Sequence, residues 1–106
     1  MTAANLRSVG DQLLTEAYAG TSRRASSTLH NSGRLRQTLI TLVEGAELAE
    51  HESPGEATLQ VLSGEVELRS GDTSVSLTSG DLVPIPSTRH SVHAGTDAML
   101  LLTVAN

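Results

Sequence analysis

Regularly spaced glycines narrow the fold of this chain more than any other feature. From Thr28 onward they recur at intervals of roughly 7 to 15 residues, the spacing of short strands joined by turns in an antiparallel sandwich or barrel. Two of the blocks that they bound, 45–64 and 80–90, each contain a histidine on a predicted strand, His51 in the first and His90 in the second. We therefore expect both the fold and any site to be built from this part of the chain.

The pattern of side chains within these blocks indicates strands with one buried face. In 65–69 aliphatic residues alternate with charged ones, and in 74–78 Val75 and Leu77 alternate with hydroxyl residues. Alternation with period two places the aliphatic set in the core and the polar set in water. The turn residues at 70–73 predict that the two strands form a hairpin.

The N-terminal part differs from the rest. Residues 5–19 carry aliphatic side chains at helical spacing, with polar residues on the other side, which predicts a short amphipathic helix. The small polar stretch 20–27 is typical of a connector. We divide the chain into a helix and connector, 1–27, and a β domain, 28–106.

Two predicted strands, 39–43 and 99–104, are apolar on both faces instead of alternating. In an antiparallel fold this pattern requires that the second face be covered as well. The cover could be the N-terminal helix or a second copy of the protein. We favour a homodimer, because the barrel would otherwise expose much aliphatic surface.

Composition excludes several classes of function. The net charge is -5, the seven basic residues are all arginine, and no cysteine is present, so nucleic acid binding, lysine chemistry and thiolate sites are not expected. Tyr18 is the only aromatic residue, so a pocket must have aliphatic and hydroxyl walls. No stretch approaches the roughly 20 apolar residues of a membrane span, and we expect a cytoplasmic protein without a membrane partner.

The block 45–64 resembles the first signature motif of the cupin superfamily. Gly45 and Gly64 stand at its two glycine ends and His51 at its first histidine. Ser53 stands where that motif has a second histidine, and Ala57 stands where it has a glutamate, with Glu56 one residue early.

The block 80–90 is similar to the second motif of the same superfamily. Gly80 and Pro86 match, Thr88 replaces a glycine, and the histidine arrives one residue early as His90, which indicates a shortened turn. The resemblance implies an all-β double-stranded β-helix, the jelly-roll barrel of small single-domain cupins, with a short N-terminal helix added. It also implies that the two motifs place metal ligands inside the barrel.

The candidate site follows from strand parity and from the resemblance together. His51 and Ser53, two residues apart on one strand, are expected to face the interior, where His90 would join them as a ligand-binding set. Because successive side chains of a strand alternate between its two faces, Glu56 is expected to face outward unless a bulge reverses its direction. The metal set that the resemblance implies is His51, Glu56 and His90, for iron, manganese, nickel or zinc held weakly or not at all. Two histidines alone are one ligand short of a catalytic zinc site or a facial triad.

Alternatives remain open at this point. His51 could be a buried imidazole satisfied by Ser53 or by a backbone carbonyl, and His90 could hold the shortened turn through its ring nitrogens. His93 could supply a third ligand, although parity places it on the opposite strand face from His90. His51 could also act as the base of a metal-free isomerase, for which no orienting acid is evident.

The leading interpretation is a barrel that binds a small molecule in an aliphatic pocket marked by two histidines, with a degenerate metal site. One rival is a metal-dependent oxygenase or isomerase acting on a small polar metabolite. Another is a non-catalytic oligomerisation scaffold. Whether the protein is an enzyme is left open by the sequence.

Overall fold

The structure is a computed structural model that describes residues 1–51 and 55–105, with the side chains of Glu50 and His51 outside the description. One helix is followed by nine strands in these described ranges: α1 (Leu6–Ala19), β1 (Arg24–Ser32), β2 (Leu35–Leu42), β3 (Glu47–His51), β4 (Glu56–Ser63), β5 (Glu65–Ser70), β6 (Thr73–Thr78), β7 (Leu82–Pro84), β8 (His90–Ala94) and β9 (Ala98–Ala105). The all-β class with a short N-terminal helix is confirmed.

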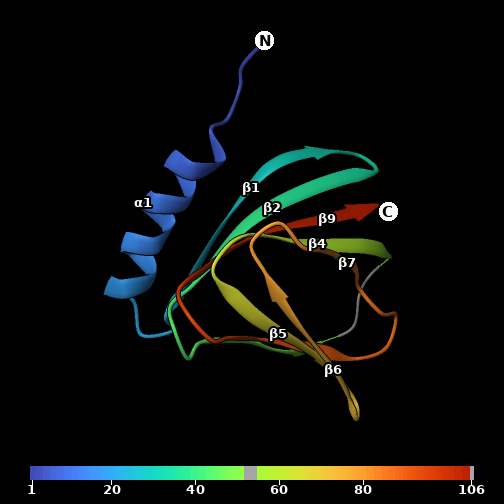
Figure 1. The fold of residues 1–106 in the computed structure, drawn as a ribbon. Helices are drawn as coiled ribbons and strands as arrows, with labels where there is room; N and C mark the ends of the chain where they lie inside the picture. Colours follow the sequence, from blue (N-terminus) through green and yellow to red (C-terminus); the bar gives the residue numbers. More distant parts are fainter. Residues whose placement is uncertain (52–54, 106) are drawn as a thin grey trace.

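The strands form two antiparallel sheets that face each other (Figure 1). One sheet has the order β1-β2-β9-β4-β7, and the other has the order β3-β8-β5-β6. Strands far apart in sequence are neighbours in both sheets, since β9 lies between β2 and β4, and β8 lies between β3 and β5. This interleaving brings the two glycine-bounded blocks together.

The space between the sheets is filled by the aliphatic residues that alternate along the strands. On β4 the odd-numbered residues Ala57, Leu59 and Val61 are buried while their even-numbered neighbours are not, as the period of a strand requires. The largest contiguous cluster draws on both sheets: Ile40, Leu42, Leu59, Val61, Val66, Leu68, Leu77, Val92, Ala94, Ala98 and Leu100.

The predicted hairpin is present as β5 and β6, which pair from Glu65 opposite Thr78 to Ser70 opposite Thr73. One assignment within it is wrong. Val75 is 42% exposed instead of buried, whereas Leu77 is 7% exposed. β6 is the edge strand of its sheet, so β5 alone flanks it within that sheet.

The helix α1 covers the outer face of β1 and β2 (Figure 1), and it buries Gly10, Leu13 and Ala17. Leu39 and Thr41 of β2 are buried outside the main cluster, so this strand is covered on both faces as its sequence predicts. β1 begins at Arg24, inside the stretch predicted as a connector. Among the described residues, no helix has both the length and the apolar character that crossing a bilayer requires.

Candidate functional site

His90 is a buried histidine at the start of β8. It is 2% exposed, and its Nδ1 lies 2.9 Å from the carbonyl oxygen of Thr88 in the preceding turn. A carbonyl oxygen can only accept a hydrogen bond, so Nδ1 carries the proton and donates. In the neutral ring the lone pair is therefore on Nε2.

His51 stands directly opposite His90 in the register of β3 and β8. Further along the same pair, Leu48 lies opposite Val92 and Glu47 lies opposite His93, and a β-bulge separates these positions from His51. Opposite residues of an antiparallel pair share a face of the sheet. The backbone thus brings the two histidines of the two motifs to adjacent positions, although the side chain of His51 lies outside the described part.

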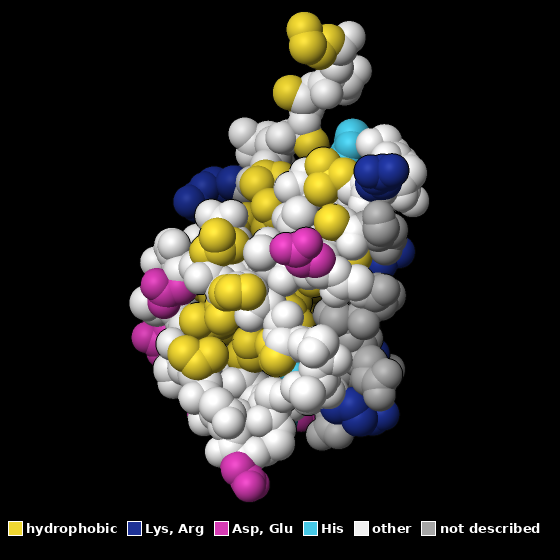
Figure 2. All heavy atoms as spheres, turned by 90° about the vertical axis from the view of Figure 1, so that its right-hand side faces the viewer, with side chains coloured by type: hydrophobic (Ala, Val, Ile, Leu, Met, Phe, Trp, Pro, Cys, Tyr) yellow, Lys and Arg dark blue, Asp and Glu magenta, His cyan; other side chains and the backbone are white. Residues whose placement is uncertain are grey.

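Aliphatic side chains surround the inner end of β8. Val92 of β8 and Leu68, its register partner on β5, are buried in the core, and Leu48 and Ile85 are partly buried against the same core. Figure 2 shows hydrophobic side chains gathered on the side of the molecule where the C-terminus and β7 lie in Figure 1. Val92, two residues beyond His90 on the same buried face of β8, thus belongs to the aliphatic core.

The other predicted site residues are Ser53 and Glu56. Ser53 lies outside the described residues. Glu56 is exposed at the start of β4, on the opposite face of that strand from the buried Ala57. Within residues 1–49 and 55–105, no group of three histidine, aspartate or glutamate side chains could hold a metal ion. Glu56 of the ligand set that the cupin resemblance implies is thus exposed, and His51 of that set lies outside the described side chains, so the set stays a prediction.

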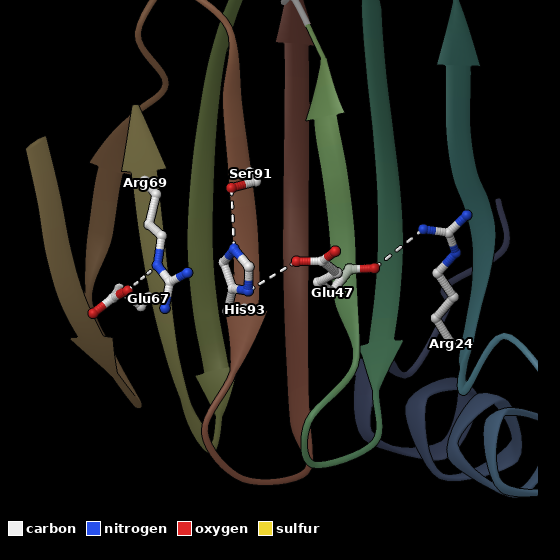
Figure 3. Close-up of polar contacts among 6 residues, drawn as sticks. All are labelled: Arg24, Glu47, Glu67, Arg69, Ser91 and His93. Carbon is white, nitrogen blue, oxygen red and sulfur yellow. Dashed lines mark hydrogen bonds and ion pairs between the residues drawn. The ribbon is translucent and has the colours of Figure 1, made fainter. Parts of the chain in front are cut away.

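The outer face of β8 carries a second group of polar side chains (Figure 3). His93 Nδ1 is 2.9 Å from Glu47 Oε2, and its Nε2 is 3.1 Å from Ser91 Oγ. On the neighbouring strand β5, Arg69 is paired with Glu67. These side chains come from three adjacent strands and form a row across the sheet.

Two grooves lie near this row. The first has a volume of about 550 Å³ and is lined by His93, Arg69, Glu67 and residues of β6. The second has a volume of about 630 Å³ and opens between β1 and β3, where the Arg24 side chain donates a hydrogen bond of 3.2 Å to the backbone oxygen of Glu47. Both grooves are open to solvent rather than enclosed in the barrel.

Sequence reasoning missed the group formed by Glu47, Ser91 and His93. Parity correctly placed His93 on the opposite face from His90, because the burial of β8 alternates. A serine and a histidine two residues apart on one strand share a face, which was a usable signal, but the carboxylate partner depends on the pairing of β3 with β8.

Comparison with known proteins gives one family and many similar structures. The sequence profile of the Cupin domain family matches residues 38–105. A conserved protein of unknown function from Streptococcus pyogenes is 27% identical, with a TM-score of 0.74, and the match covers 82% of this chain and 77% of that one. An RmlC-like cupin from Desulfovibrio desulfuricans is 28% identical, with a TM-score of 0.71 and coverage of 99% and 91%.

A larger protein shares the fold alone. The salicylate 1,2-dioxygenase of Pseudaminobacter salicylatoxidans is 21% identical with a TM-score of 0.80, and the match covers 92% of this chain but 33% of that one. No curated protein matches this chain.

Proposed function

This chain belongs to the Cupin domain family, and we propose that it binds a small molecule inside its barrel, at a pocket marked by His51, Ser53 and His90. The observation that carries the proposal is the state of His90. This imidazole is buried, and the turn fixes its Nδ1 proton on the Thr88 carbonyl. The register position of His51 supports a second imidazole at the same place.

The chemistry of the walls limits the ligand. Val92, Leu68 and Ile85 are aliphatic, and the only aromatic residue, Tyr18, is 49% exposed on α1. A small ligand with an aliphatic part matches this lining. A flat aromatic ligand would find no ring to stack on among these walls.

A metal-dependent enzyme is the weaker reading of the same pocket. Its ligand set would be His51, Glu56 and His90, for iron, manganese, nickel or zinc. The exposure of Glu56 on the outer face of β4 counts against that set, and two imidazoles are one ligand short. The dioxygenase among the similar structures resembles this chain in fold and does not alter this assessment.

The test is a ligand screen on the full chain purified without an affinity tag. We expect metal-free protein whose Tm rises with particular small aliphatic metabolites, and loss of that rise in His90→Leu. His93→Leu is the matched control, because His93 sits on the opposite face of the same strand and its replacement should leave the rise intact.

Two outcomes would overturn the proposal. Near-stoichiometric metal that disappears in His51→Ala would favour the enzyme. If His90→Leu folds and neither metals nor metabolites shift the Tm of the parent protein, the scaffold function is left.

The homodimer is a separate proposal, for which the partner is a second copy of this chain. Beyond the edge of α1, the outer-face positions 58, 60 and 62 of β4 and 101 and 103 of β9 form a patch without a charged residue, and Glu56 stands at the end of that patch. Leu82 of β7, opposite Gln60, adds a side chain that is 63% exposed. An uncharged patch can meet its own copy around a two-fold axis without burying an unpaired ion.

A further inference from the structure

Ser91, His93 and Glu47 form a continuous chain of hydrogen bonds on the outer face of β8 and β3 (Figure 3). The Glu47 carboxylate is 2.9 Å from His93 Nδ1, and Ser91 Oγ is 3.1 Å from His93 Nε2. Each partner therefore contacts a different ring nitrogen. This is the order of groups that activates a serine hydroxyl in acyl-transfer enzymes of several unrelated folds.

The partners also determine where the protons are. An ionised carboxylate can only accept, so the neutral ring of His93 carries its proton on Nδ1 and donates it to Glu47. Nε2 then has the lone pair and accepts a hydrogen bond from the hydroxyl of Ser91. The half-buried imidazole is thus oriented as a base toward that hydroxyl.

We propose that Ser91 is a nucleophile toward small acyl esters, with His93 as its general base and Glu47 as the positioning residue. Ser91 Oγ attacks the ester carbonyl and forms the new C–O bond while its proton passes to His93 Nε2. The tetrahedral intermediate expels the alcohol, which takes that proton. Water then attacks the acyl-serine by the same proton transfers in reverse, releasing the acid and the free serine.

The adjacent groove supplies a place for the substrate and narrows its class. His93 and Arg69 are in its lining, and Arg69 is the register partner of Ser91 on β5. Its guanidinium, anchored through Nε by Glu67, is the cation on this face positioned to stabilise a developing oxyanion. The carboxylates of Glu65 and Glu67 repel anions, so esters of neutral or cationic alcohols are the expected class.

The chain contains its own control for this chemistry. On β1, His30 Nε2 is 2.9 Å from Ser32 Oγ, with the same spacing of two residues as His93 and Ser91. Among the described residues, no carboxylate pairs with His30. If the carboxylate is what fixes the tautomer, Ser91 should react and Ser32 should not.

The experiment uses the full chain, p-nitrophenyl acetate as the activated ester, and mass spectrometry of peptides after acid quenching. We expect an acetyl group on Ser91 and none on Ser32. His93→Gln should reduce the rate of acetylation on the order of 10²-fold, and Ser91→Ala should remove the label. Ser74→Ala, which removes an exposed hydroxyl of β6 that does not line the groove, is the matched variant that should retain the rate.

A readout specific to positioning tests Glu47. Glu47→Gln should slow acetylation and shift its pH profile, because the neutral amide no longer stabilises the imidazolium facing Glu67 and Arg69, and Glu47→Asp should restore part of the rate. Equal labelling of Ser91 and Ser32, or an acetylation rate unchanged in His93→Gln, would overturn the proposal. Since His90 faces the interior, failure here leaves the proposed ligand pocket untouched.

Discussion

The hydroxyl of Tyr18 donates a hydrogen bond to the Oδ2 carboxylate oxygen of Asp97, which ties the end of α1 to the turn before β9. The other carboxylate oxygen of Asp97 accepts the backbone N–H of Glu44 at 2.8 Å. Arg23 lies over the Tyr18 ring, 5.1 Å from its centre, and donates to the Tyr18 carbonyl at 2.8 Å. One exposed carboxylate therefore joins the helix to two barrel loops.

Replacing Tyr18 with phenylalanine should loosen α1 without unfolding the barrel. The variant keeps the ring under Arg23 but loses the donor to Asp97. We expect faster amide exchange across α1, unchanged exchange in β4 and β9, and a small fall in Tm, since the bond is exposed. Thr15→Ala, which removes an exposed hydroxyl of the same helix, is the control, and equal exchange in both variants would contradict the role of Tyr18.

Asp97 should make part of the stability depend on pH. The hydrogen bond from Tyr18 and then that from the Glu44 N–H hold the pKa of Asp97 below its usual 3.8. A carboxyl whose folded pKa is lowered stabilises the fold fully above its unfolded pKa and loses that contribution as pH falls through the folded pKa. The Tm advantage of the parent over Asp97→Asn should therefore be constant near neutral pH and shrink below about pH 4. A Tm difference between the parent and Asp97→Asn that stays constant down to about pH 2 would contradict a stabilising role of the ionised Asp97 carboxylate.

Gly64 should tolerate no side chain. Its φ is +86°, and a Cβ there would stand 2.1 Å from the backbone oxygen of Asp97 and 2.9 Å from the Ala98 Cα, neither of which can rotate away. Gly64→Ala should lower the free energy of unfolding by about 2 to 3 kcal/mol or more, measured by urea denaturation. Gly71→Ala, with φ of +57° and open space around it, should lower it by about 1 kcal/mol. If the two variants lost equal free energy of unfolding, the close contact with the Asp97 oxygen would not contribute to the loss at Gly64.

The exposed Leu82 tests the second copy. If the uncharged patch of β4 and β9 joins two chains, Leu82→Glu places a charge opposite Gln60, next to that patch. Sedimentation should then show a dimer for the parent chain and a monomer for the variant. Val75→Glu introduces the same charge at an exposed aliphatic position on the other sheet, and it should leave the dimer intact. A parent chain that sediments as a monomer would rule the dimer out.

The fold could be read from the chain because its signals are local. The period of Val66 and Leu68, the helical spacing before residue 20 and the two glycine-bounded motifs each depend on neighbouring residues. The exposure of Val75 could not be predicted in the same way, because it depends on which strand lies at the edge of the sheet.

The candidate site required more than local pattern. That His51 and His90 stand opposite each other follows from the pairing of β3 with β8, and the proton on His90 Nδ1 follows from the turn geometry at Thr88. Neither the opposite positions of the two histidines nor the place of the proton can be inferred from the spacing of the residues along the sequence. The same pairing brings Glu47 to His93, which no count along a single strand could predict.

β8 is a two-sided element, with His90 turned inward and His93 turned outward on five residues of strand. Sliding that strand by one position would exchange the environments of both rings at once, because every side chain would change faces together. Neither histidine can therefore change its face of the sheet without the other. Insertions in this region are consequently tolerable only in the loop before residue 90, and any that reach the strand itself should abolish both chemistries in a single step.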